Sequence, residues 1–266
     1  MSIKQPAHRT LRQRLWQYAS PKNFSNVAMK TIPWLLGAAA LLALIGLFLG
    51  WVVAPIDGVQ GPVYRILYIH VPSSWLSMFL YLMMVFWSLV YLLFKTKLSA
   101  WFTQAIAPTG ALFCFVSLVS GAIWGQPTWG TYWVWDARLT SMLFLLFLYL
   151  GYLALSHSLP AGPRAYVAGS ILVIVGGVNL PIIHYSVIWW QTLHQGASLS
   201  FSGGNRMAYS MLWPLLIMTL AAWLYAWGVI LWRCRLIIAE QALNQRQTWL
   251  VHEGQDLDLS AKGTKS

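Results

Sequence analysis

The composition of this 266-residue chain is that of a membrane protein. Hydrophobic residues make up 58% of it and charged residues 9%, whereas a soluble domain carries roughly 25% charged residues, and the mean hydropathy is +0.60. Between Thr31 and Leu231 the acidic residues are Asp57 and Asp136. These values exclude an ordinary soluble enzyme. The net charge of +11 favours membrane surfaces over nucleic acid, because the basic residues concentrate near the two chain ends.

Six apolar stretches are each long enough to cross a bilayer as a helix, which needs about 20 residues. They cover residues 33–54, 72–94, 105–124, 138–157, 165–187 and 209–231. The first is too long for the apolar core of a cleaved signal peptide, which has about 7 to 15 residues. We therefore expect an all-α integral membrane protein with six transmembrane helices. Its parts are a basic N-terminal segment 1–31, a six-helix membrane domain 32–231 and a C-terminal tail 232–266.

The distribution of Lys and Arg predicts the orientation of these spans. An even number of spans places both termini on one side of the membrane. That side, with the loops 95–104 and 158–164, carries 14 of the 17 Lys and Arg residues, and the other side carries Arg65, Arg138 and Arg206. Since positive loops stay in the cytoplasm, we expect both termini to be cytoplasmic. The loops 55–71, 125–137 and 188–208 should then face outward.

Three of the six histidines fall on the expected outer side: His70, His184 and His194. His70 comes two residues before Pro72, which is expected to open the second span because a proline fits the first helical turn. His184 lies near the outer end of the fifth span, where Pro181 predicts a kink. A single membrane histidine is more often structural than a ligand. Two at one level on different spans favour a shared site, so we expect His70 and His184 to face each other and His194 to lie in a flexible loop.

The loop 124–138, between the third and fourth spans, is unusually rich in aromatic residues. Within twelve residues it contains Trp124, Trp129, Tyr132, Trp133 and Trp135. Trp and Tyr gather at any membrane–water interface, and this alternative suits Trp189 and Trp190 well. Concentration on one short loop instead favours a flat amphipathic surface for a large planar apolar ligand, with indole faces for stacking and N–H groups for polar edges.

Asp136 and Arg138, at the end of this loop, each allow two interpretations. Asp136 is expected to cap the N-terminus of the fourth span, and capping is favoured over a role in catalysis. Arg138 can extend its side chain to the interface. It can also pair with an acidic ligand, as can Arg65 and Arg206.

Three segments resemble, in order and spacing, the haem exporter protein C family of the bacterial cytochrome c maturation system. They are His70-Val-Pro, the run from Trp129 to Ser141, which is similar to the tryptophan-rich "WWD" signature of haem-handling proteins, and the run from Asn179 to Ser186. The resemblance covers about residues 32–231. It implies that haem b is carried as transient cargo at the periplasmic face, with the iron held by His70 and His184. The porphyrin would lie against residues of the loop: Trp124, Trp129, Tyr132, Trp133, Trp135, Asp136 and Arg138.

The resemblance also implies a location in the bacterial inner membrane and a set of partners. These are a periplasmic haem chaperone, an ABC-type ATPase with its membrane subunit, and a small single-span membrane protein. The sequence has no nucleotide-binding loop, so energy would come from another chain, and we expect a binding and transfer protein rather than an enzyme. The alternatives are a haem b electron carrier, a transporter with an aromatic vestibule, which would place polar residues deep in its spans, and a structural membrane scaffold.

Overall fold

The computed structural model describes residues 21–190, 192, 194 and 207–263. Within these residues the chain is helical and has no strand. Six helical segments are long and apolar enough to cross a membrane: Asn23–Val53, Pro62–Phe94, Lys97–Trp129, Ala137–Ser158, Pro163–Trp190 and Tyr209–Gln247. The six predicted spans are therefore confirmed, and most are longer than the apolar stretches alone indicate.

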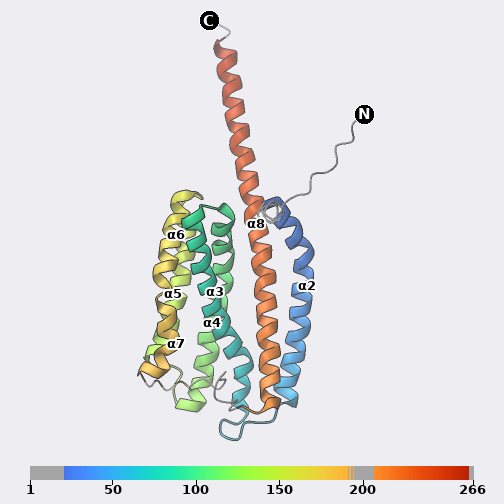
Figure 1. The fold of residues 1–266 in the computed structure, drawn as a ribbon, viewed down its shortest axis with the longest axis vertical. Coiled ribbons are helices and arrows are strands. Elements are labelled where there is room, and N and C mark those ends of the chain that lie inside the picture. The colour runs from blue at the N-terminus through green and yellow to red at the C-terminus, as the bar shows by residue number, and fades with distance from the viewer. Residues whose placement is uncertain (1–20, 191, 193, 195–206, 264–266) are drawn as a thin grey trace, which may run out of the picture.

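The six spans run alternately up and down through one bundle (Figure 1). In chain order they are α2 (Pro21–Phe48), which continues as a π-helix (Leu49–Val53), a 3₁₀ helix (Pro62–Ile66), α3 (Leu67–Phe94), α4 (Lys97–Trp129), α5 (Ala137–Ser158), α6 (Pro163–Gly176), α7 (Asn179–Trp190) and α8 (Tyr209–Gly263). As a result, α3, α5 and α8 begin at the end of the bundle where α2, α4 and α7 finish.

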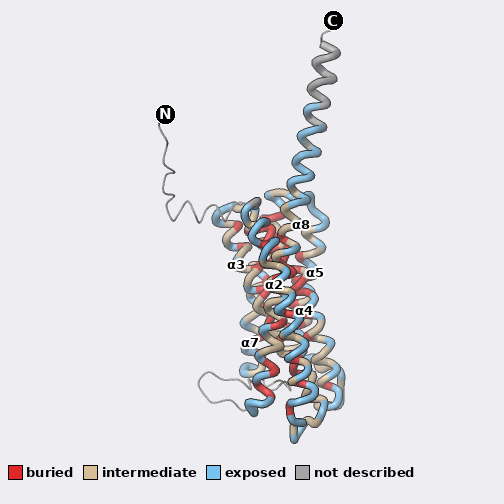
Figure 2. The backbone as a smooth tube through the Cα atoms, turned by 90° about the vertical axis from the view of Figure 1, so that its right-hand side faces the viewer, coloured by how far each residue is buried: buried red, intermediate tan, exposed pale blue. Residues whose placement is uncertain are grey.

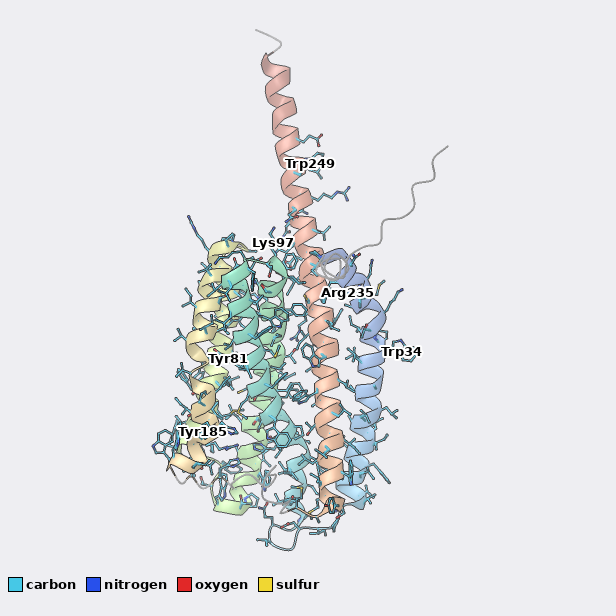
Figure 3. The ribbon with its side chains drawn as sticks, viewed as in Figure 1. Trp34, Tyr81, Lys97, Tyr185, Arg235 and Trp249 are labelled. Atoms are coloured by element: carbon cyan, nitrogen blue, oxygen red, sulfur yellow. The ribbon has the colours of Figure 1, made fainter. Side chains whose placement is uncertain are left out.

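The interior of the bundle is formed mainly by α3, α4 and α5. Tyr81 and Tyr149 are fully buried there, and the Tyr149 hydroxyl donates to the Ser77 carbonyl at 2.7 Å. The outer surface is apolar as well, as Trp34, 80% exposed, illustrates. Figure 2 shows this contrast between buried and exposed residues, and Figure 3 shows Tyr81 turned inward and Trp34 outward. An apolar exterior around a packed interior is what a lipid environment requires.

The first and last spans form a pair, with α2 packed mainly against α8 (Figure 1). Their close approach depends on glycine. A Cβ atom at Gly46 would lie 2.8 Å from the Met218 side chain, and one at Gly228 would lie 2.7 Å from Leu36. Small residues allow helix backbones to approach closely in membranes, where van der Waals packing holds helices together.

The second span begins earlier than predicted, so the expectation that Pro72 opens it is wrong. Pro62 occupies the first turn of the 3₁₀ helix that leads into α3, and a proline fits this position because its missing N–H has no helical partner there. Pro72 lies inside α3. More than half of the expected outer loop 55–71 is therefore helical.

The fifth span is broken where Pro181 predicts a kink. The helix stops at Gly176 and resumes at Asn179. Pro181 has no N–H for the carbonyl of Gly177, and that carbonyl instead accepts from the Leu180 N–H at 3.1 Å. The prediction of a distortion at this point is confirmed.

The sixth span continues beyond the bundle as one helix. In Figure 1, α8 projects past the end of the bundle at which α2 begins, and it runs to Gly263 without a break. The expected boundary at residues 231 and 232 lies within this helix. In the same way, α2 begins at Pro21, inside the expected N-terminal segment 1–31; residues 1–20 lie outside the described part of the chain.

Candidate functional site

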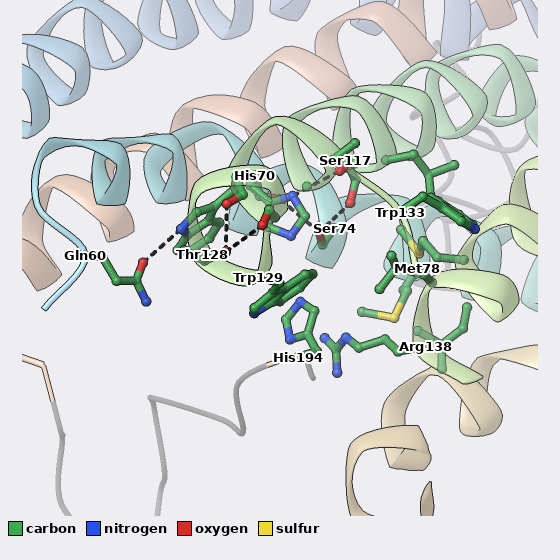
Figure 4. A pocket seen from close by; sticks show the side chains of 18 residues that line it. Gln60, His70, Ser74, Met78, Ser117, Thr128, Trp129, Trp133, Arg138 and His194 are labelled. Atoms are coloured by element: carbon green, nitrogen blue, oxygen red, sulfur yellow. Dashed lines mark hydrogen bonds between the residues drawn. The ribbon is translucent and has the colours of Figure 1, made fainter. Parts of the chain in front are cut away.

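A pocket lies at the end of the bundle where α4 finishes and α5 begins. Its empty volume is about 780 Å³, part of it open to solvent. Side chains from α3, α4, α5 and α7 converge on it together with His194 (Figure 4). Among its 18 described lining residues none is acidic, and Arg138 carries the permanent charge. The pocket therefore suits an apolar ligand that bears negative groups.

His70 enters the pocket from the first turn of α3 and is 9% exposed. Its ring is turned against α4. The Nδ1 atom lies 3.0 Å from the Ser117 carbonyl oxygen and 3.1 Å from the Ser120 hydroxyl oxygen. Trp124 packs edge-to-face on the same ring, with 5.6 Å between centroids. The orientation of His70 is thus determined by residues of a single neighbouring helix.

The second histidine of the pocket is His194. Its ring centroid lies 6.2 Å from that of His70, with 32° between the ring planes, and 6.2 Å from the ring of Trp129. Figure 4 shows His70, Trp129 and His194 gathered on one side of the pocket and the side chain of Arg138 extending beside His194. The site thus contains two imidazoles next to an indole.

His184, which the sequence pairs with His70, lies elsewhere. It is exposed on α7 and packs edge-to-face on Tyr185, with 4.8 Å between centroids. Tyr185 is at the outer edge of the bundle (Figure 3) and stacks on Trp189. The structure therefore brings His70 together with His194 and does not bring it together with His184.

The aromatic residues of the tryptophan-rich segment divide into two groups. Trp124, Trp129 and Trp133 line the pocket, and the Trp124 Nε1 donates to the Gln60 Oε1 at 2.8 Å. Tyr132 and Trp135, in contrast, are 63% and 76% exposed and are not among the lining residues. Trp135 nevertheless packs on one of the pocket-lining residues, because its ring lies edge-to-face on Trp133, with 5.5 Å between centroids.

The segment that the sequence assigns to one loop, 124–138, is largely helical at its start. α4 continues to Trp129 and ends at Gly130, whose positive φ of 79° suits glycine and whose N–H donates to the Gln126 carbonyl at 2.9 Å. Pro127 is tolerated in this last turn because it removes a single helical hydrogen bond. The expected loop is thus reduced to residues 130–136, and the helix itself carries Trp124 and Trp129.

Asp136 and Arg138 mark the start of α5. The Asp136 carboxylate accepts from the Leu139 N–H at 2.7 Å, which confirms the predicted N-cap, an interaction that contributes about 1 kcal/mol to helix stability. Two residues later, Arg138 lines the pocket. Of the two expected roles for Arg138, this position favours contact with an acidic ligand.

The other lining residues have no motif in the sequence that marks them as part of a site. They include Gln60, Met78, Gly121, Met142 and Ile183. One signal was present in α7, where Asn179, Ile183 and Ser186 are buried. Their spacing of four and three residues marks the inward face of a helix, and His184 is not on it.

The fold and the site together define a class of protein: a helical membrane protein with six spans and a pocket lined by histidine and tryptophan at one end of the bundle. Residues 14–249 match the family described as Heme exporter protein C. The relatives that bear that name include proteins from three bacteria. The one from Bradyrhizobium diazoefficiens is 45% identical over 76% of this chain and 77% of its own length. The one from Escherichia coli K12 is 47% identical over 69% and 75%, and the one from Paracoccus denitrificans is 38% identical over 86% and 95%. The chain belongs to the Heme exporter protein C family.

Proposed function

We propose that this protein holds haem b as cargo at the periplasmic face of the bacterial inner membrane and passes it to a periplasmic haem chaperone for the maturation of c-type cytochromes. The observation that carries the proposal is the placement of His70 and His194 in one pocket beside Trp129. Membership of a family named for heme export supports the same cargo.

Two imidazoles suit an iron ion that is already inside a macrocycle. Haem iron has four ligands from the porphyrin and needs two axial ones. With bonds of about 2 Å from an ion to one nitrogen of each ring, the two ring centroids would lie roughly 6 Å apart, close to the observed 6.2 Å. Within the described residues no three His, Cys, Asp or Glu side chains form a group that could hold a free metal ion, which favours a ligand that supplies most of its own coordination.

The rest of the pocket suits the remainder of haem. The indoles of Trp124, Trp129 and Trp133 offer flat apolar faces to a porphyrin, and Arg138 offers a cation to its carboxylates.

We infer that His70 and His194 are the axial ligands. The pair chosen from the sequence, His70 and His184, is the alternative, and it would require the exposed ring of His184 to leave Tyr185 and enter the pocket. Both alternatives keep His70.

The open side of the pocket supports the proposed transfer step. Part of its volume is open to solvent, so haem held there is accessible to an acceptor protein on the same side of the membrane. Binding and release would be the role of this chain, with no catalytic step of its own. An ABC-type ATPase, its membrane subunit and a small single-span protein are the partners that we propose for the supply of energy and the control of release.

A visible spectrum of the purified protein with added haem tests the function. We expect the absorption bands of a low-spin, bis-imidazole haem, and we expect these bands to decline when the haem-free chaperone is added, as haem moves to it. A protein that binds no haem would contradict the proposal. Low-spin haem that the chaperone cannot remove would favour the electron carrier.

The orientation has its own test. A reporter enzyme that is active outside the cytoplasm is expected to be active when fused after Thr131 or Ser200 and silent when fused after Lys97 or at the C-terminus, because the pocket end must face the periplasm. The reverse pattern would place the pocket in the cytoplasm and contradict the transfer proposal.

A further inference from the structure

The ring of His70 lies in a seat on α4 that is made by three neighbouring residues: Ser117, Ser120 and Gly121. The Ser117 carbonyl and the Ser120 hydroxyl approach the Nδ1 atom at 3.0 and 3.1 Å. Gly121 provides the space, since a Cβ atom there would lie 2.8 Å from the His70 Cε1 and 3.3 Å from its Nδ1.

The chemistry of this seat selects one tautomer of the ring. A carbonyl oxygen accepts hydrogen bonds and cannot donate them, so the contact with Ser117 requires a proton on Nδ1. The Ser120 hydroxyl lies 2.6 Å from the Val116 carbonyl oxygen, to which it donates, and it therefore meets Nδ1 as an acceptor too. A neutral imidazole with its proton on Nδ1 has its lone pair on Nε2.

We propose that this seat on α4 fixes His70 as the Nδ1–H tautomer and thereby makes Nε2 the atom that binds iron. The proposal deepens the haem-binding function and rests on it. Ser120 and Gly121 are then positioning residues, which act on the iron through His70. Hydrogen bonding of the second ring nitrogen of a ligating histidine fixes its orientation and raises its basicity, and loss of such a partner commonly weakens metal binding roughly 10- to 100-fold.

The seat also links the position of the His70 ring to that of two pocket-lining tryptophans. The same helix that holds the ring of His70 carries Trp124 and Trp129, one and two turns further along. A shift of α4 would therefore move both indoles together with the groups that hold the imidazole, whereas the backbone of His70 belongs to α3.

The tautomer can be measured without haem. Protein labelled with ¹⁵N-histidine, in a lipid nanodisc, gives separate nitrogen resonances for protonated and unprotonated ring nitrogens, and the His70→Gln variant assigns those of His70. We expect the proton on Nδ1 in the haem-free protein. A proton on Nε2 would overturn the proposal, whatever the protein does with haem.

Substitutions in the seat test its effect on iron. We expect Ser120→Ala to weaken haem binding about tenfold and to raise the haem midpoint potential, because a less basic imidazole stabilises ferric iron less. Ser120→Thr retains a hydroxyl and should restore both values. Gly121→Ala should displace the ring and weaken binding further; since that variant can also fail to fold, Ser120→Ala carries the test.

Two matched controls separate these effects from general damage. The Ser73 hydroxyl donates to the carbonyl one turn earlier, that of Ile69, at 2.7 Å, as Ser120 does to Val116, and no described contact joins it to the ring; Ser73→Ala should leave the midpoint potential unchanged. Gly151→Ala adds a methyl group where no atom lies within 4 Å.

Equal haem affinity and equal midpoint potential in wild type, Ser120→Ala and Ser120→Thr would overturn the proposed role of the seat. A wild-type protein without low-spin haem would instead defeat the proposed function, and the haem-free measurement would still decide the tautomer.

Discussion

Alanine at His70 or at His194 is expected to convert the bound haem from a low-spin to a high-spin form or to release it on washing. Each change removes one iron bond and leaves the tryptophans in place. The loss of retention should exceed the roughly 10- to 100-fold cost of removing a partner in the outer shell of a metal site. The measurement is the visible spectrum and the haem content of each variant per correctly inserted protein, after equal washing.

His184→Ala is the matched control for this experiment. His184 is a histidine of the same end of the bundle, exposed and packed on Tyr185 outside the pocket, so its loss should leave the low-spin spectrum intact. Added imidazole should restore a low-spin spectrum to the variants at His70 and His194 by filling the vacated position. If His184→Ala lost the low-spin bands and His194→Ala kept them, the second ligand would be His184, as the sequence predicts.

Alanine at Trp129 or Trp133 is expected to weaken haem retention without changing the spin state of the haem that remains, because the iron bonds are untouched. A buried Trp removes about 150 to 250 Å² from water, which at roughly 25 cal/mol per Å² gives an upper bound of several kcal/mol. The pocket is partly open, and we expect about 2 kcal/mol, or roughly a 30-fold loss of affinity. Haem titration of detergent-purified variants measures it.

The exposed aromatic residues provide the controls for the pocket-lining tryptophans. Trp135→Ala and Tyr132→Ala remove side chains that are mostly exposed, and they should cost less than the changes inside the pocket. Trp189→Ala and Trp190→Ala, at the end of α7, should lower the stability of the inserted protein and leave haem retention unchanged. Equal haem retention in the pocket and interface variants would show that the tryptophan-rich segment only anchors the protein in the interface. The hypothesis of a haem-binding surface would then be abandoned.

The features that the sequence predicts well are those that depend on local chemistry. A run of apolar residues forms a membrane helix because its backbone must satisfy its own hydrogen bonds in lipid, so the six spans follow from hydropathy. Asp136 caps α5 because a carboxylate there meets free N–H groups. The break near Pro181 follows from a missing donor. None of these depends on which other helix lies nearby.

The pairing of histidines depends on helix rotation and on the course of the chain after α7, which no local pattern determines. Ile183 is buried and lines the pocket, and His184 follows it by one residue, or about 100° around the helix axis, which turns its ring outward. His194 returns to the pocket from beyond the end of α7. The end of α4 differs from the prediction for a related reason. Residues 124–129 have the composition of a loop, yet α4 continues through them because a single proline near a helix end removes only one backbone hydrogen bond.

The pairing of α2 with α8 has a consequence for how the protein is made. Spans emerge from the ribosome in chain order, so α2 enters the bilayer first and its main packing partner enters last. During the synthesis of everything in between, α2 must persist alone among lipids. Its span has a mean hydropathy of 2.4, above the 1.9 to 2.1 of the other five, which suits a helix that has to remain inserted without neighbours. The arrival of α8 then completes the bundle, so that a truncated nascent chain lacks the main packing partner of its first helix.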